Sequence, residues 1–194
     1  MKRLLDFGIA LIGCTILTPV FLALAFLVAR ESPGGAIYRQ ERIGKNGRPF
    51  FLLKFRSMRA NMPGPEITVG NSDPRITRTG QWLRKTKLDE LPQLWNVVKG
   101  DMSLVGPRPE VAKYVALYTP KQRGVLNVRP GLTDPASIDA FDEGARLEAA
   151  DDPDTYYREV ILPQKVNLQL AYLRTANVLT DGRVIIRTLL RILQ

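Results

Sequence analysis

The residues of this 194-residue chain with the clearest potential for chemistry are two adjacent carboxylates, Asp89 and Glu90. They follow three cations within five residues and precede the apolar positions of a predicted helix over 91–98. A helix N-terminus offers free N–H groups and the positive end of the dipole, and both favour an ionised carboxylate. Two roles are open to such a pair: an ordinary helix cap, or a nucleophilic or metal-binding carboxylate.

Other reactive side chains are scarce, and this narrows the chemistry. The chain contains no histidine and one cysteine, Cys14. This composition excludes a Ser-His-Asp or Cys-His catalytic machine, a zinc site built from His and Cys ligands, and an intramolecular disulfide. Ionic catalysis must therefore come from carboxylates, Lys, Arg, Tyr or hydroxyl groups, with a hard cation such as magnesium as the natural helper.

The charge distribution indicates an anionic partner. The net charge is +9, and residues 1–133 hold 21 of the 28 Lys and Arg residues. A basic body of this kind suits nucleic acid, phospholipid head groups or a phosphorylated ligand. The acidic stretch 139–154 is interpreted as a solvated loop and helix, because its spacing matches no EF-hand loop.

Two basic segments could hold phosphate. Arg108 lies between Pro107 and Pro109, which fix the backbone on both sides and present a planar, doubly donating guanidinium. The alternative is a rigid surface turn with an exposed arginine. Lys54 and Arg56 could help to hold a phosphorylated substrate, or they could belong to a solvated face that rests on anionic lipid.

A few short elements must position these side chains. Strand-forming residues at 36–40 and 50–55 flank an Asn-Gly turn within 44–47, which predicts a β-hairpin beside the basic segment. Residues 61–80 hold three Pro and three Gly and predict mostly loop. The helical pattern resumes at 81–85, and Pro92 suits the first turn of the helix over 91–98.

The N-terminal region is a long apolar run, with 23 uncharged residues over 7–29. That length could cross a bilayer, but cations flank both ends, and the positive-inside rule would keep both in the cytoplasm. Pro19 removes a helical hydrogen bond near the middle, and the Thr18 hydroxyl can bond a freed carbonyl. We therefore favour a re-entrant helix-break-helix over a spanning helix, and both over a cleaved signal peptide.

The C-terminal segment 183–193 is amphipathic. Its arginines, Arg183, Arg187 and Arg191, repeat every four residues and line one face of a predicted helix. Such a helix could pack on the core or lie in a membrane interface, and we favour the interface.

Residues 88–109, which read LDELPQLWNVVKGDMSLVGPRP, resemble the core motif of the bacterial sugar transferases, and specifically of the monotopic phosphoglycosyl transferases. The N-terminal run resembles the re-entrant anchor of that family. No further membrane helix or large domain precedes the catalytic part, so the chain resembles the small form of the family. The similarity also includes these segments: Gln40-x-Arg42-x-Gly44-x-x-Gly47, 54–58 and 73–78.

The resemblance implies transfer of a phosphosugar from a UDP-sugar to a polyprenyl (undecaprenyl) phosphate, with release of UMP and use of Mg²⁺. Asp89 would attack the sugar-linked phosphate, form a covalent phosphosugar intermediate and contribute to the metal site. Glu90 would help to deprotonate or position the acceptor, or organise the metal site. Arg84 and Arg108 would contact substrate phosphates. Such an enzyme initiates glycoconjugate and polysaccharide assembly at the cytoplasmic face of the bacterial inner membrane.

The chain departs from the family pattern at two places. Thr18 stands where the family has Ser before the proline of the anchor break, a chemically close exchange. Residues 130–138 are similar to one branch of the small transferases, but Phe141 stands where that branch carries an arginine before an acidic pair. The role of that arginine would pass to Arg146, or the donor pocket would differ.

Together these features predict a helix-rich α+β fold in a monotopic membrane protein. The expected parts are a re-entrant anchor at 1–30 and a cytoplasmic-face catalytic domain at 31–194, with a small β-hairpin and interfacial amphipathic helices. The main rival is a non-enzymatic basic module that binds anionic membrane lipids or a partner. A nucleic-acid binder would explain the charge but not the apolar run.

Overall fold

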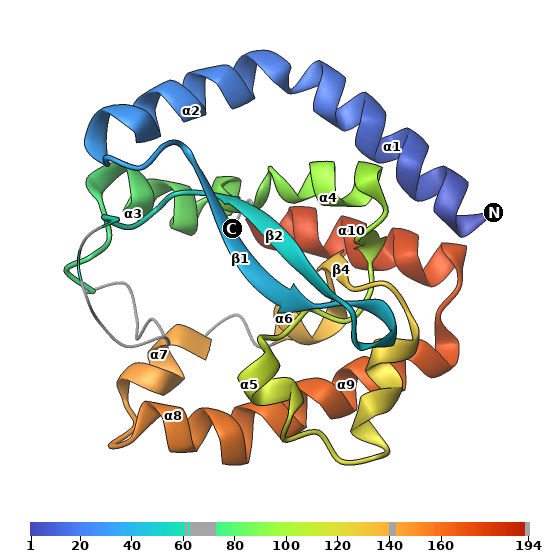
Figure 1. Cartoon of the computed structure of the whole chain (residues 1–194). Helices are drawn as coiled ribbons and strands as arrows, with labels where there is room; N and C mark the ends of the chain where they lie inside the picture. The colour runs from blue at the N-terminus through green and yellow to red at the C-terminus, as the bar shows by residue number, and fades with distance from the viewer. Residues whose placement is uncertain (61, 63–72, 140–142, 193–194) are drawn as a thin grey trace.

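The computed structural model describes residues 1–60, 62, 73–139 and 143–192, and it has the helix-rich α+β architecture that the sequence predicts. Helices α1 and α2 form an arch along one side, the β1–β2 hairpin crosses the middle, and α5, α8 and α9 lie on the opposite side (Figure 1). The predicted exchange at Phe141 lies outside the described residues. The helices are α1 (Lys2–Ile16), α2 (Thr18–Glu31), α3 (Arg78–Lys85), α4 (Gln93–Lys99), α5 (Ala112–Val115), α6 (Pro135–Asp139), α7 (Glu143–Glu148), α8 (Pro153–Tyr156), α9 (Leu162–Thr175) and α10 (Val178–Ile192).

The N-terminal run is broken where the sequence predicted a break. Helix α1 ends at Ile16 and α2 begins at Thr18, and the two helices are bent by 63°. Pro19 occupies the first turn of α2, and the Thr18 hydroxyl donates to Cys14 O at 2.8 Å. In the described part of the chain no single helix is long and apolar enough to span a bilayer, although this bent pair passes the same test together. Insertion into one leaflet, and a domain boundary at residue 30, stay predictions.

The first turn of α1 is tied to the rest of the protein by polar contacts. Arg3 donates to the carbonyls of Val97 (2.6 Å) and Val98 (3.0 Å), so its charge lies at the C-terminal end of α4, where a cation is favourable. Asp6 is buried and accepts a hydrogen bond of 2.7 Å from Ser103 Oγ. Lys2 Nζ lies 2.5 Å from Asp181 Oδ2 on α10. These contacts fix α1 against α4 and α10.

The predicted hairpin is present. Strands β1 (Ile37–Ile43) and β2 (Pro49–Phe55) pair antiparallel, and the turn between them places Asn46 and Gly47 at positive φ (58° and 73°). Buried Asn96 on α4 then completes the free edge of β2, accepting from Leu53 N (3.0 Å) and donating to Phe51 O (2.8 Å). The hairpin is thereby held against the helix that follows the carboxylate pair.

A second sheet, which the sequence did not predict, lies beside α4. Strands β3 (Ser103–Val105) and β4 (Gly131–Thr133) pair in parallel, and all three β3 residues are buried. A Cβ at Gly131 would overlap the backbone of Gly106, so only glycine permits this approach. The sheet presents the Pro-Arg-Pro turn that follows β3.

Helix α10 confirms the predicted C-terminal helix and packs on the core, whereas its contact with a membrane interface stays a prediction. Val184 packs into the main core cluster, whereas Ile186, Leu189 and Leu190 are exposed. One face therefore packs on the core, and apolar surface is left for another environment.

Candidate active site

The carboxylate pair lies in a tight helical turn between α3 and α4. The turn spans Leu88–Glu90, and Lys87 precedes it with φ of 57°, a left-handed conformation that reverses the chain after α3. Leu91 and Pro92 have right-handed helical angles and lead directly into α4. Neighbouring residues on a helix point in directions about 100° apart, so Asp89 and Glu90 meet different surroundings.

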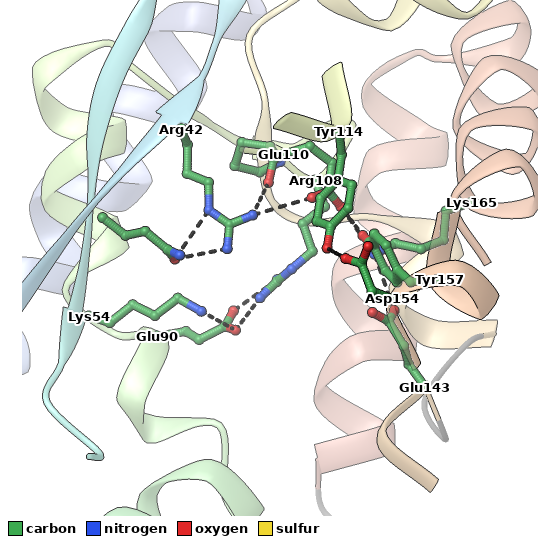
Figure 2. A network of polar contacts seen from close by, with 12 residues as sticks. Arg42, Lys54, Glu90, Arg108, Glu110, Tyr114, Glu143, Asp154, Tyr157 and Lys165 are labelled. Carbon is green, nitrogen blue, oxygen red and sulfur yellow. Dashed lines mark hydrogen bonds and ion pairs between the residues drawn. The ribbon is translucent and has the colours of Figure 1, made fainter. Parts of the chain in front are cut away.

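Glu90 is held by two cations. Arg108 donates to both of its carboxylate oxygens, Nη1 to Oε2 at 3.1 Å and Nη2 to Oε1, and Lys54 Nζ lies 3.5 Å from Oε1. Figure 2 shows Lys54 and Arg108 reaching Glu90 from β2 and from the turn after β3. Burial alone would raise the pKa of Glu90, but Arg108 and Lys54 outweigh it and hold that pKa well below its usual range. Glu90 is therefore an ionised group that fixes the two cations.

Asp89 is in the opposite situation. Its side chain is buried, with 8% of the residue exposed, and Oδ1 has no hydrogen-bond partner. Burial raises the pKa of Asp89, the charge of Glu90 raises it further, and Lys54 and Lys87 offset this only in part. A buried carboxylate oxygen without a hydrogen-bond partner is chemically able to attack an electrophile or to bind a cation.

The carboxylate of Asp89 is the group at this site that best suits a magnesium ion, because cations do not hold it as they hold Glu90. Asp89 Oδ1 is unpaired, whereas both oxygens of Glu90 are bound by cations. In residues 1–60, 62, 73–139 and 143–192 no group of three or more His, Cys, Asp or Glu could hold a metal. Mg²⁺ is commonly bound by one or two carboxylates together with substrate phosphates and water. The donor set fits a cation that arrives with a diphosphate rather than a preformed cage.

A second buried network holds the backbone of the Pro-Arg-Pro turn. Arg42 on β1 donates to Pro109 O (3.1 Å) and to Glu110 Oε2 (3.4 Å), and Glu110 Oε1 accepts from Tyr157 OH (2.6 Å) and Lys165 Nζ (3.3 Å). Burial would raise the pKa of Glu110, but Lys165 and Arg42 outweigh it and lower that pKa. This network links β1, the turn and α9 (Figure 2). It fixes Glu110, the residue directly after the Pro-Arg-Pro turn.

Comparison with known proteins decides the family. The model of the bacterial sugar transferases matches residues 1–194. The chain belongs to the bacterial sugar transferase family. Two relatives named UDP-glucose:undecaprenyl-phosphate glucose-1-phosphate transferase are 35% identical to it, one from Caulobacter vibrioides over 191 residues and one from Escherichia coli over 195 residues. A relative from Aeromonas hydrophila, named UDP-N-acetylgalactosamine-undecaprenyl-phosphate N-acetylgalactosaminephosphotransferase, is 39% identical over 159 residues.

The matches cover most of this sugar transferase but less of its relatives. They cover 96%, 98% and 76% of this chain, and 67%, 40% and 37% of the Caulobacter, Escherichia and Aeromonas proteins. The chain thus spans about two thirds of the first relative and less than half of the other two. The names of these relatives share undecaprenyl phosphate and a UDP-sugar; two name glucose and the third names N-acetylgalactosamine.

The transferase brings together four of the residues singled out from its sequence: Asp89, Glu90, Lys54 and Arg108. Arg56 lies elsewhere, because β2 ends at Phe55 and the guanidinium donates to Gly34 O (2.8 Å) and Gly35 O (2.9 Å). Its contact with substrate stays a prediction.

Three other predicted positions lie outside this cluster. Arg84 is half-buried at the end of α3, and its contact with substrate phosphate stays a prediction. Thr18 and Pro19 mark the helix break. Arg146, the suggested substitute for the missing arginine, donates to Tyr156 OH at 3.1 Å.

Sequence reasoning missed Glu110, Lys165 and Gln93. Glu110 directly follows the Pro-Arg-Pro motif, and Lys165 precedes the apolar Val166 on a helix that also carries Arg174, so each position gives only a weak signal of a buried ion pair. Gln93 lies one turn beyond Asp89 in the motif itself.

Proposed function

We propose that this protein transfers a phosphosugar from a UDP-sugar to undecaprenyl phosphate, with release of UMP, through a covalent intermediate on Asp89. The observation that carries the proposal is the buried, unpaired Oδ1 of Asp89 beside two cations that Glu90 holds in place. The family and the names of the relatives support the two substrates.

In the first half of the reaction Asp89 Oδ1 forms a bond to the phosphorus that carries the sugar. The bond from that phosphorus to the bridging oxygen of the diphosphate breaks, and the electron pair leaves on UMP. Arg108 and Lys54 stabilise the phosphate charges, and because Glu90 orients Arg108 in advance, little reorganisation is needed during the reaction. Bound Mg²⁺ would reduce the repulsion between an anionic nucleophile and a diphosphate, with Asp89 as its protein ligand.

In the second half a phosphate oxygen of undecaprenyl phosphate attacks the same phosphorus, and the carboxylate of Asp89 leaves. A phosphate monoester has a second pKa of about 6 and is largely dianionic at neutral pH, so its attack needs no proton acceptor. Glu90, whose pKa is lowered, is a weak base in any case. We therefore assign Glu90 to positioning Arg108 and Lys54 rather than to proton transfer.

We propose further that the bent helix pair is a re-entrant anchor in the cytoplasmic membrane, with the site at the cytoplasmic face among anionic lipids. One side of α1 exposes large apolar residues, Leu4, Leu5, Ile9, Ile12 and Ile16. Trp82 on α3 and Trp95 on α4 each expose about half of their surface, and exposed tryptophans are typical of membrane interfaces. This placement would let a soluble nucleotide sugar meet a lipid-borne phosphate.

A UMP-release assay tests the reaction, with a panel of UDP-sugars, undecaprenyl phosphate and Mg²⁺. We expect release only with both substrates at steady state, and a protein-bound phosphosugar detectable by mass when the acceptor is omitted. Asp89→Asn should lower turnover by about 10³-fold or more, whereas the matched exchange Asp151→Asn, on an exposed aspartate, should not.

Normal turnover by a folded Asp89→Asn protein would contradict the nucleophile assignment. If the wild-type protein binds anionic vesicles and releases no UMP with any donor, the non-enzymatic membrane module is correct instead.

A further inference from the structure

The two buried polar atoms that lack a partner lie together on one helical stretch. Among the described residues, the side-chain N and O atoms that are buried without a hydrogen bond are Asp89 Oδ1 and Gln93 Nε2. Gln93 is 1% exposed. Buried polar groups in folded proteins are almost always hydrogen-bonded, so two exceptions at one place indicate a ligand that both atoms serve.

Gln93 lies just beyond the turn that holds the proposed nucleophile, Asp89. The backbone is right-handed helical from the turn at Leu88–Glu90 through Leu91 and Pro92 into α4. The stretch is tightly wound, with hydrogen bonds from Leu91 N to Leu88 O and from Leu94 N to Leu91 O, so Gln93 follows Asp89 by little more than one turn. A long helical side chain covers the turn N-terminal to its own Cα, and for Gln93 this is the turn that holds Asp89.

The neighbouring side chains of α4 that follow Gln93 do not bind its amide nitrogen. Val97, one turn after Gln93, is buried and apolar. Asn96, the polar neighbour on α4, already uses its amide oxygen for Leu53 N and its amide nitrogen for Phe51 O. Both amide groups of Asn96 are committed to β2, and the donor of Gln93 is left for a substrate.

We propose that Gln93 is a catalytic residue whose Nε2 donates a hydrogen bond to a non-bridging oxygen of the phosphoryl group while that group is bonded to Asp89. This inference rests on the proposed function. A transferring phosphoryl group carries negative charge on three equatorial oxygens, and these oxygens lie next to the attacking Oδ1. The two cations at the site, Lys54 and Arg108, are shared with Glu90.

The neutral amide suits this position because of the charge on Asp89. A Lys or Arg at position 93 would pair with Oδ1 directly and occupy the oxygen that must form the new bond. An amide N–H stabilises the phosphoryl oxygens more weakly, but it leaves Asp89 available.

The test compares Gln93→Met, which keeps the shape and removes the donor, with Gln93→Glu, which replaces the donor by an acceptor. Removal of one donor to a developing oxyanion lowers turnover by about 10²–10³-fold. We therefore expect Gln93→Met to lose about this much in kcat, with KM for the UDP-sugar changed only a few-fold, and the single-turnover formation of the phosphosugar adduct slowed equally. Gln93→Glu should be at least as impaired.

Thermal unfolding separates this role from a structural one. Gln93→Met removes a buried donor without a partner, so its Tm should equal or exceed that of the wild type. The matched control, Gln122→Met in the Gln122–Asn127 turn, should keep wild-type kcat.

Wild-type kcat in Gln93→Met would overturn this inference and leave the proposed function intact. So would a Gln93→Glu protein as active as the wild type, which would make the residue a cation ligand and not a donor. No UMP release by the wild-type protein would overturn the proposed function and the inference with it.

Discussion

Replacement of Asp89 by Asn should abolish transfer and, at the same time, stabilise the folded protein. Burial raises the pKa of Asp89, and the charge of Glu90 raises it further. The folded state therefore binds a proton at Asp89 more readily than the unfolded chain does, and ionisation of this group lowers the free energy of unfolding. An asparagine of the same shape carries no charge and avoids this loss.

The sign of the effect depends on pH. An unperturbed aspartate has a pKa of about 3.9, and the folded-state pKa of Asp89 is higher. Between these two values the wild-type protein loses stability as pH rises, because the folded state holds the proton that the unfolded state has released. The stability gained by Asp89→Asn should be absent below the lower value, increase across this interval and stay constant above it.

The size follows from the burial and the missing partner. A buried polar group without a hydrogen bond costs about 1–3 kcal/mol, and more when charged. For a chain of this length each kcal/mol shifts Tm by roughly 2–4 °C, so we expect a gain of a few degrees or more near neutral pH.

The assay is thermal unfolding of the wild type, Asp89→Asn and Asp151→Asn in one detergent with EDTA, repeated from about pH 4 to about pH 8. The surface control should stay within about 0.5 kcal/mol of the wild type. A less stable Asp89→Asn protein at neutral pH, or a stability gap that does not change with pH, would refute the reasoning.

Two further predictions concern the supports of the site. Gly131→Ala should prevent folding, because the new Cβ would overlap the backbone of Gly106. The control Gly182→Ala, with open space around the new Cβ, should be neutral or stabilising. Circular dichroism and Tm measure both outcomes, and a folded Gly131→Ala protein would contradict the prediction. Glu110→Gln should destabilise by about 1.5–3 kcal/mol, the value of a hydrogen bond to a charged group, because buried Lys165 loses one carboxylate partner and keeps Glu143 at 3.1 Å. Lys165→Met in the same chain should recover part of the loss in urea unfolding. Equal stability of the single and double variants would count against this pair.

The sequence predicted those features that depend on local backbone chemistry. The hairpin turn needs positive φ at neighbouring positions, and Asn46-Gly47 is a pair that adopts it readily. The helix break follows from Pro19, which cannot donate to the preceding turn. In both places a few adjacent residues determine the geometry, so no tertiary information was needed.

The second sheet could not be predicted in this way. Its strands, Ser103–Val105 and Gly131–Thr133, hold three residues each and show no usable periodicity. Their pairing depends on the close approach of Gly106 and Gly131, which only the folded chain brings together. Parallel strands need long connections, and such distant contacts leave little trace in short sequence windows.

In the candidate site, too, the residues could be identified from short sequence segments, whereas their contacts could not. The 88–109 motif identified Asp89, Glu90 and Arg108 as chemically important, and the basic segment 54–58 identified Lys54, but only the folded chain shows which of these residues pair. Arg56 was grouped with Lys54 because the two are close in sequence. In the structure β2 ends between them, and Arg56 binds two backbone carbonyls instead.

Asp89 and Glu90 differ in their surroundings because neighbouring residues on a helical turn point in different directions. Glu90 points toward the hairpin and the Pro-Arg-Pro turn, where Lys54 and Arg108 hold it ionised, while Asp89 points into the interior and keeps Oδ1 unpaired. Two carboxylates whose surroundings move their pKa values in opposite directions are typical of a division of roles at an active site. Because Glu90 binds the two cations, they stay beside Asp89 without pairing with Oδ1. Without Glu90, the same cations would face Asp89 alone and neutralise the oxygen that must attack phosphorus.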